Sequence, residues 1–261
     1  MTRPLLLLSN DDGFFAKGIR AARDVLAQTF DVVVVAPSSE QSASSHALTL
    51  ARPLRAFEAE PGVWAVDGTP ADCVYLALHG DTRFLPRKPD VVVSGINRGL
   101  NLGQDVFYSG TVAAAREGAL RNIPALAVSA HHEASLPEVA AVASRLAHEL
   151  CANEAHRSGK AGHRAPLLSL NVPRPWTGEV RSVKLGMRIY EEIIVERKDP
   201  RGRAYYWIGG PTVSNSQEEG TDTAVFDQGI ASLTSLILDL THGHDHGLAE
   251  RLAAHASAPG A

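Results

Sequence analysis

The segment "LLLLSNDDGF", residues 5–14, runs from four consecutive leucines directly into two neighbouring aspartates and a glycine. A short continuous apolar run is typical of a strand that is buried on both faces of a parallel sheet. Asp11 and Asp12 repel each other, and beside a dry core they are costly unless they are paired or bind a cation. The same residues also suit a turn or a helix cap, so the rest of the chain must decide between the two interpretations.

Valine-rich runs alternate with amphipathic stretches over the first 150 residues or so. We expect further buried strands at 31–37, 89–97, 123–130 and 167–173. We expect helices at 18–30, 69–80, 110–120 and 136–150, with Thr69 as the N-cap and Pro70 in the first position of the second helix. This alternation predicts an α/β fold with a mostly parallel sheet and helices on both of its faces.

The pattern changes after about residue 155. A polar connection at 153–166 precedes the strand at 167–173, and residues 179–210 alternate and turn at Asp-Pro-Arg-Gly, which indicates a β-hairpin. Such an arm often packs on a partner subunit. We expect a late strand at 231–243, a short helix at 247–256 and a frayed end at 257–261.

The composition excludes some partners. The chain has 261 residues, a net charge of −4 and a pI near 6.3, so its overall charge does not favour a nucleic-acid polymer or an anionic membrane. Two isolated cysteines, Cys73 and Cys151, form no disulfide framework and indicate a reducing compartment. The leucine run is too short for a signal sequence or a membrane span, so we expect a cytoplasmic soluble protein.

Polar side chains follow three of the expected strands. Asp11 and Asp12 follow the first, a serine-rich loop at 38–50 follows the second, and "GINRGLNLGQDVFYSG" closes and follows the strand at 89–97. The carboxyl ends of parallel strands meet at one edge of a sheet, where ligands bind. Carboxylate, hydroxyl and amide oxygens suit Mg²⁺ or Mn²⁺, and a cation would remove the repulsion between the two aspartates.

The stretch "YSGTVAAAREG" opens a helix with small residues, Ser109, Gly110 and Thr111. A helix N-terminus offers free N–H groups to an anion, although Ser109 or Thr111 could also serve only as an N-cap. The glycine-rich loop before it lacks the lysine of a P-loop and the spacing of a dinucleotide site. A cation beside an anion cradle fits metal-assisted transfer of a phosphoryl group to water.

Five segments in this order resemble the SurE family of metal-dependent 5′/3′-nucleotidases. They are "SNDDGFFAKGI", "VVVVAPSSEQSASSHALTL", "VDGTPADCVYLAL", "PDVVVSGINRGLNLGQDVFYSGTVAAAREG" and "DPRGRAYYWIGG", and the match runs from about residue 4 to about residue 240. The resemblance implies one Rossmann-like, three-layer α/β/α domain over 1–261. It also implies a β-hairpin arm at about 180–240 that is exchanged in homodimers or homotetramers.

The resemblance further implies hydrolysis of nucleoside monophosphates, with short polyphosphate as a second substrate. It assigns one divalent ion per subunit, Mg²⁺ or Mn²⁺, to Asp11, Asp12, Ser42 and Asn97, with Asp11 and Asp12 as the catalytic residues. It assigns the phosphate to Asn10, Asn101, Ser109, Gly110 and Thr111. The chain departs from the family at Ser38-Ser39, where Asp-Arg is common, and at Ala43, where glycine is common.

Alternatives stay open at this point. A haloacid-dehalogenase phosphatase needs a second aspartate two residues after the first, and Gly13 and Phe14 occupy those places here. A non-catalytic nucleotide-binding regulatory module on the same fold is the other alternative. His46, in the serine-rich loop, could reach a phosphate. His131-His132 and the "HGHDHG" cluster at 242–247 are expected on the surface. The preferred base, the 5′ or 3′ preference, the metal and the oligomer size are left open.

Overall fold

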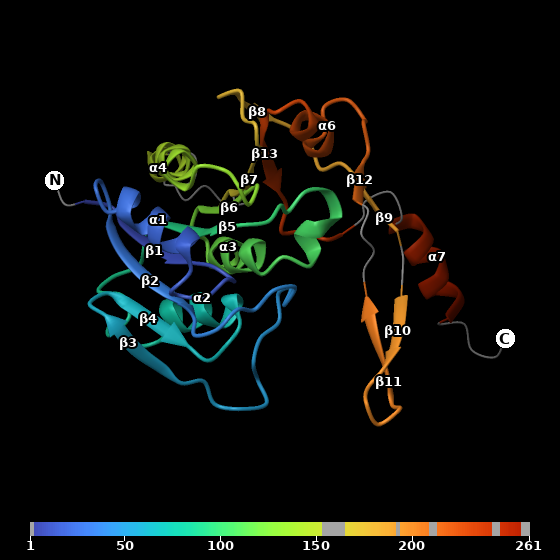
Figure 1. Ribbon diagram of the computed structural model, residues 1–261. Helices are drawn as coiled ribbons and strands as arrows, with labels where there is room; N and C mark the ends of the chain where they lie inside the picture. The colour runs from blue at the N-terminus through green and yellow to red at the C-terminus, as the bar shows by residue number, and fades with distance from the viewer. Residues whose placement is uncertain (1–2, 153–164, 192–193, 209–212, 242–245, 257–261) are drawn as a thin grey trace.

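The computed structural model describes residues 3–152, 165–191, 194–208, 213–241 and 246–256. A nine-stranded sheet forms the centre, in the order β3-β4-β2-β1-β5-β6-β7-β13-β8 (Figure 1). Its strands are β1 (Leu5–Ser9), β2 (Asp31–Pro37), β3 (Ala56–Glu60), β4 (Val63–Val66), β5 (Val91–Asn97), β6 (Ala125–Ala130), β7 (Leu167–Val172), β8 (Val180–Ser182) and β13 (Ala231–Leu236).

The sheet is mostly parallel, as the alternating pattern predicts. Every pair from β4 to β7 is parallel, whereas β3 on β4 and β13 on β7 are antiparallel. β1 lies between β2 and β5, with Leu6 opposite Val32 and Val91. This position explains the leucine run, because a strand with neighbours on both sides and helices on both faces needs apolar side chains throughout.

Helices cover both faces of the sheet, which confirms the three-layer α/β/α architecture (Figure 1). Leu6 and Leu8 pack in one core with α1 and α4, while Leu5 and Leu7 pack in a second core with α2 and α3. The four helices are α1 (Lys17–Leu26), α2 (Pro70–His79), α3 (Gly110–Leu120) and α4 (Leu136–Ala152). Alternate side chains of one strand therefore bury against opposite layers.

Local signals set the ends of α2 as expected. Thr69 is its N-cap: the Thr69 side chain accepts a hydrogen bond from the N–H of Asp72, and the Asp72 carboxylate accepts one from the N–H of Thr69. Pro70 occupies the first turn and Gly80 the C-cap. α1 ends at Leu26, before the residue 30 that the pattern predicts, since Gln28 and Thr29 close the helix with turn-type bonds.

The C-terminal part adds small elements outside the central sheet. These are the two-stranded sheets of β10 (Ile194–Lys198) with β11 (Ala204–Ile208) and of β9 (Arg188–Tyr190) with β12 (Val213–Asn215), and the helices α6 (Asp222–Asp227) and α7 (His246–Ala256). β10 and β11 form the expected hairpin, and its turn is held by Asp199, whose Oδ1 accepts from the N–H groups of Arg201 and Arg203.

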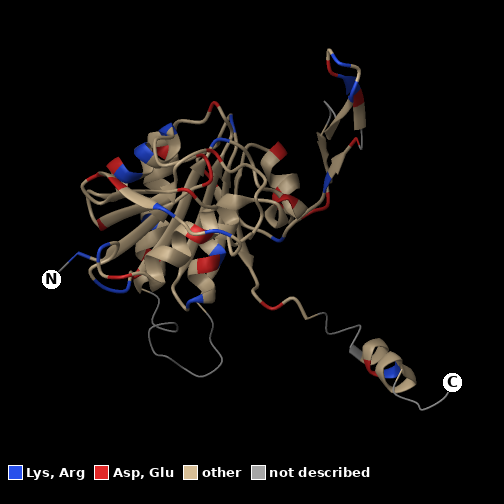
Figure 2. Ribbon diagram, turned by 90° about the horizontal axis from the view of Figure 1, so that it is seen from below, with Lys and Arg blue, Asp and Glu red and all other residues tan. Residues whose placement is uncertain are grey.

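The hairpin and α7 both project from the body of the molecule (Figure 2). The late strand ends at Leu236 rather than at 243. The polar connection at 153–164, the C-terminal residues 257–261 and His242 to Asp245 lie outside the described residues. Among the helices that the structure describes, none is both long and apolar enough to cross a membrane.

Candidate active site

The ends of three neighbouring strands, β2, β1 and β5, deliver the predicted polar residues to one edge of the sheet. A cavity of about 380 Å³ lies there. It is lined by Asp11, Ser42, Ala43, Asn97, Leu100, Asn101, Asp105, Tyr108, Ser109 and Tyr190. Four predicted residues are not in this lining: Asn10, Asp12, Gly110 and Thr111. The strands thus gather residues that lie up to about 90 positions apart in the sequence.

Asp11 is the more deeply buried of the two neighbouring aspartates. It is only 6% exposed, and both the hydroxyl and the backbone N–H of Thr111 donate to it. Burial raises the pKa of Asp11 to about 6, the charge of Asp12 adds to the rise, and the bonds from Thr111 oppose it. The ionised form is therefore held at a cost that a bound cation would relieve.

Asp12 is half-buried and is not among the residues that line the cavity. Burial raises the pKa of Asp12, the charge of Glu40 adds to this, and the backbone N–H and charge of Arg98 oppose it. Glu40 is a third acid at this edge that the sequence reasoning missed, although it stands two residues before Ser42. The charge of Asp12 raises the pKa of Asp11 and the charge of Glu40 raises that of Asp12, which fits a cation better than a helix cap.

Ser42 and Asn97 use their hydrogens within the protein. The Ser42 hydroxyl donates to Glu40 Oε1 at 2.6 Å, and Asn97 Nδ2 donates to the Gly99 carbonyl at 3.0 Å. Oxygen lone pairs of both side chains are left to accept. Together with the carboxylates of Asp11 and Asp12, these oxygens form the donor set that a hard cation such as Mg²⁺ or Mn²⁺ prefers, so the residues present fit such an ion.

Gly110 lets the N-terminus of α3 approach Asp11 closely. A Cβ at residue 110 would lie 2.8 Å from Cβ of Asp11 and 3.0 Å from Oγ of Ser44. Ser109 is the N-cap of α3, because its Oγ accepts from the N–H of Val112 at 3.0 Å, so the capping interpretation is right for this residue. Its hydroxyl hydrogen is still free to reach a ligand in the cavity that Ser109 lines.

Asn101 is fixed by residues that the sequence analysis did not single out. The buried amide of Asn171 accepts from the Asn101 N–H at 2.8 Å and donates to the Asn101 carbonyl at 3.1 Å. Asn101 Nδ2 donates to Ser129 Oγ at 2.7 Å. Both supporting residues stand near the ends of mostly apolar strands, "ALAVSA" and "LLSLNV", and this was the signal available in the sequence.

Asn10 shapes the turn after β1. Its Nδ2 donates to the Gly13 carbonyl at 2.9 Å, and its Oδ1 is buried without a hydrogen-bond partner among the described residues. Gly13 has φ of +96°, a conformation that suits glycine. The turn carries the two aspartates out of the core, and Asn10, which is not in the cavity lining, holds that turn.

The outer wall of the cavity comes from the C-terminal part of the chain. Asp105, in the short helix η1 (Gly103–Phe107), accepts the Tyr190 hydroxyl at 2.6 Å and a guanidinium N–H of Arg188 at 2.5 Å. Burial and the bond to Asp105 raise the pKa of Tyr190 to about 12. Asp222 links η1 to the segment just before β9, since it accepts from the N–H groups of Gly103 and Gly186.

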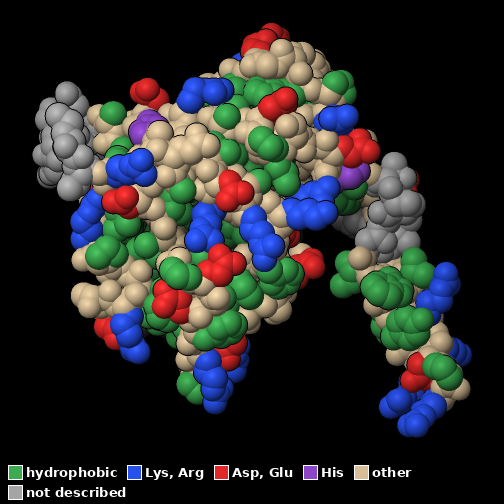
Figure 3. All heavy atoms as spheres, turned by 60° about the vertical axis from the view of Figure 1, so that its left-hand side comes forward, with side chains coloured by type: hydrophobic (Ala, Val, Ile, Leu, Met, Phe, Trp, Pro, Cys, Tyr) green, Lys and Arg blue, Asp and Glu red, His purple; other side chains and the backbone are tan. Residues whose placement is uncertain are grey.

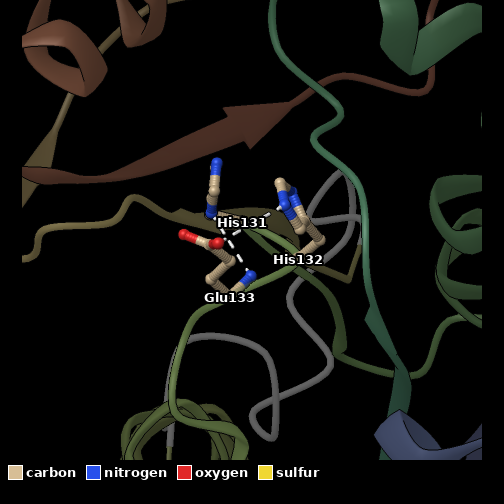
Figure 4. Close-up of side chains that lie close together, drawn as sticks. All are labelled: His131, His132 and Glu133. Atoms are coloured by element: carbon tan, nitrogen blue, oxygen red, sulfur yellow. Dashed lines mark hydrogen bonds and ion pairs between the residues drawn. The ribbon is translucent and has the colours of Figure 1, made fainter.

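Among the described residues, no histidine lines the cavity. His46 contacts Glu117 instead of entering the site. His131, His132 and Glu133 follow β6 and place a possible ligand atom each within 4.8 Å of one another (Figure 4). His132 is exposed, as expected, and Glu133 faces the guanidinium of Arg174 at 3.7 Å.

Known proteins resemble this chain in sequence. A family model described as Survival protein SurE matches residues 6–192. The 5′-nucleotidase SurE of Sorangium cellulosum is 56% identical over 254 residues, which cover 97% of this chain and 96% of that protein. The chain belongs to the SurE family.

Other SurE proteins agree in sequence and in fold. The 5′-nucleotidase SurE of an Anaeromyxobacter species is 50% identical over 242 residues, with 91% of each chain covered. The crystal structure of the SurE protein from Aquifex aeolicus superposes with a TM-score of 0.77 at 35% identity, and the match covers 96% of this chain and 100% of that one. The SurE resemblance of the motifs is therefore confirmed, and so is the α/β fold.

Proposed function

We propose that this SurE chain is a metal-dependent phosphatase that hydrolyses nucleoside 5′- and 3′-monophosphates to nucleoside and phosphate, with short polyphosphate as a further substrate. The observation that carries the proposal is the position of Asp11. Its carboxylate lies at the end of β1, among oxygen donors, against the N-terminus of α3. The names of the relatives support the nucleotidase activity.

Four residues would hold one divalent ion per subunit, Mg²⁺ or Mn²⁺: Asp11, Asp12, Ser42 and Asn97. The ion, when bound, polarises a phosphate oxygen and lowers the pKa of a coordinated water. Asp11 is the acid/base residue of the proposal. Burial raises the pKa of Asp11 to about 6 in the metal-free protein, and a bound cation would favour the ionised carboxylate, the form that accepts a proton.

The phosphate would lie between these acids and α3. Gly110 is the first residue of α3, so its N–H lies at the N-terminus of this helix. The amide of Asn101 and the hydroxyl of Ser109 border the cavity. The oxygen of water attacks phosphorus and gives up a proton, the bond from phosphorus to the ester oxygen breaks, and that ester oxygen takes up a proton to leave as the nucleoside hydroxyl. In this proposal Asp11 and Asp12 accept the first proton and supply the second.

The nucleoside would occupy the outer part of the cavity. Tyr108 and Tyr190 line it, and aromatic faces stack on any nucleobase with little discrimination. The volume of about 380 Å³ lies within the range of pockets for small ligands. A pocket built this way recognises the phosphate tightly and the base loosely.

We propose that residues 1–261 form one domain, and that its arm at about 180–240 joins subunits into a homodimer or homotetramer. Ile194, Trp207 and Ile208 of the hairpin are 69%, 65% and 91% exposed. Figure 3 shows hydrophobic side chains gathered along the hairpin and basic ones at its tip. A large apolar surface on a projecting element is typical of a protein–protein contact. Light scattering during gel filtration measures the mass of the assembly.

The experiment that tests the activity is phosphate release from a panel of 5′- and 3′-nucleoside monophosphates and tripolyphosphate. The protein is first treated with EDTA and then supplied with Mn²⁺ or Mg²⁺. We expect release that depends on metal and is lost on EDTA treatment. Nucleotide binding without release from any substrate, by a folded protein with metal present, would instead indicate the non-catalytic regulatory module.

A further inference from the structure

The loop at 38–50 carries Ser42 to the site without any helix or strand of its own. Two of its residues, Ala43 and Ser45, have φ of 56° and 53°, in the left-handed region that is unfavourable for residues other than glycine. The cost is on the order of 1–2 kcal/mol for each residue. Contacts with the rest of the protein must therefore hold the loop in this shape.

Some of these contacts are made by the loop backbone and hydroxyls. The N–H of Gln41 donates to the carbonyl of Asp11 at 2.8 Å. Ser45 donates from its N–H to the Tyr108 carbonyl at 3.0 Å and from its hydroxyl to the Phe107 carbonyl at 2.7 Å. These bonds tie the loop to β1 and to the segment before α3, and the Ala47 carbonyl and Thr49 N–H tie its later part to Thr69 and Asp72 at the start of α2.

A side chain makes the contact that reaches the body of α3. His46 Nε2 lies 2.9 Å from Oε2 of Glu117, a residue whose side chain is 2% exposed in the middle of α3. The other carboxylate oxygen of Glu117 accepts from Arg121 at 2.9 Å. Burial alone would raise the pKa of Glu117, but the bonds from His46 and Arg121 outweigh it and keep that pKa below its ordinary value. Glu117 is therefore ionised at neutral pH, and His46 Nε2–H is the donor.

The position of Glu117 gives this contact its significance. α3 presents its N-terminus to Asp11, and Glu117 lies two turns further along the same helix. A buried carboxylate that loses one of its partners is strongly destabilised, so the contact between His46 and Glu117 is not easily given up. The loop is thus docked on the helix that also presents Thr111 to Asp11.

Ser44 is a second residue of the loop that lies close to α3. Its Oγ is buried and has no hydrogen-bond partner among the described residues. It lies where a Cβ on Gly110 would come within 3.0 Å, at the entrance to the first turn of α3. The docked loop therefore brings two hydroxyls to this region: Ser42 lines the same cavity as Asp11, and Ser44 lies beside Gly110.

We propose that His46 is a positioning residue: its bond to Glu117 docks the loop at 38–50 on α3 and so sets Ser42 beside Asp11 for metal binding and Ser44 beside the N-terminus of α3 for the phosphate. The inference rests on the proposed function, because it takes Ser42 as a ligand of the divalent ion. His46 itself contacts neither the ion nor the substrate.

The test combines metal binding with exchange of the loop. In the full-length protein, Mn²⁺ affinity is measured by calorimetry, and hydrogen exchange of residues 38–50 is measured without metal by mass spectrometry. We expect H46A to weaken Mn²⁺ binding by about 10- to 100-fold, the usual effect of losing a residue that orients a metal ligand. We also expect faster exchange in the loop, and we expect H46Q, which keeps an N–H near the Nε2 position, to restore most of both.

Two further variants keep the test decisive. H46A leaves Glu117 with one partner fewer, so H46A/E117Q removes the buried charge and should fold while still binding Mn²⁺ weakly. His148, which stacks on Phe30 and is not in the cavity lining, provides the control H148A. Unchanged Mn²⁺ affinity and unchanged loop exchange in folded H46A would overturn the proposal. A wild-type protein that binds no Mn²⁺ refutes the proposed function, whereas loop exchange in metal-free protein still reports on docking.

Discussion

Thr111 donates its hydroxyl hydrogen to Oδ1 of Asp11 across 100 positions of the sequence. The contact joins the end of β1 to the first turn of α3, and the backbone N–H of Thr111 strengthens it. The partial positive charge of the helix N-terminus and these two donors stabilise the ionised carboxylate, while burial destabilises it more strongly. Asp11 is thus held in a charged form that costs the metal-free protein stability.

The variant Asp11→Asn should therefore separate stability from activity. We expect metal-dependent phosphate release to fall by on the order of 10²- to 10⁴-fold, as is typical when an acid/base residue is lost. We expect the free energy of unfolding of the metal-free protein at pH 7 to rise by about 2–3 kcal/mol, the equivalent of a pKa that rises from 3.8 to about 6. Urea denaturation in EDTA measures it, and the exposed Asp24 provides the control D24N.

The pH dependence of the metal-free protein follows from the same pKa. Because the pKa of Asp11 is higher in the folded state than in the unfolded state, the folded state binds more protons between these values. The contribution of Asp11 is greatest below about pH 4 and is lost as the pH rises through about 6. We expect wild type to lose stability relative to D11N over this interval in EDTA. A difference between the two proteins that does not change with pH would contradict the raised pKa.

The sequence predicted most of the fold and the inner part of the site. Leu5 to Leu8 form a strand because both faces of β1 are covered, and the strand ends then carry Asp11 and Asn97 to one edge. Periodicity could not predict β3, because "AFEAE" is an exposed edge strand with a shift in register against β4. Its side chains carry no core pattern to detect.

The outer part of the site could not be predicted from local signals. Asp105 meets Tyr190 and Arg188 through contacts that span more than 80 positions, and none of the three stands in a pattern that marks a partner. The same holds for Asn171. A polar residue near the end of a buried strand indicates that its side chain is hydrogen-bonded, but the sequence does not show that Asn101 is the partner. Long-range polar pairs depend on packing between elements, and packing is visible only in three dimensions.

Removal of one hydroxyl tests the coupling between Thr111 and Asp11. Thr111→Val keeps the shape of the side chain but removes a donor to the carboxylate, so the pKa of Asp11 should rise further. We expect Mn²⁺ affinity at neutral pH to fall by about 10-fold or more. The control is Thr234→Val, since Thr234 is buried and its hydroxyl has no partner among the described residues. Equal Mn²⁺ affinities in the two variants would show that the bond does not orient Asp11.

Asp222 tests how the outer wall is held. Its carboxylate accepts from the buried N–H of Gly103 and the half-buried N–H of Gly186, so Asp222→Ala leaves two donors without their partner. We expect a loss of about 2–6 kcal/mol in the free energy of unfolding, at about 1–3 kcal/mol for each unsatisfied group. The exposed Glu219 provides the control E219A. Chemical denaturation measures both, and a loss in D222A no larger than in E219A would show that water replaces the carboxylate.

Tyr190 distinguishes recognition of the nucleoside from recognition of the phosphate. Its ring lines the cavity, and its hydroxyl is held by Asp105. If a base stacks on this ring, Tyr190→Ala removes about 1–3 kcal/mol of binding, so KM for nucleoside monophosphates rises about 5- to 150-fold. KM for ribose 5-phosphate, which has no base, stays the same. Tyr205 is 43% exposed against 42% for Tyr190 but lies on the hairpin, so Y205A is the matched control. A parallel rise of KM for both substrates in Y190A would assign the ring to holding the wall of the site rather than to contact with the base.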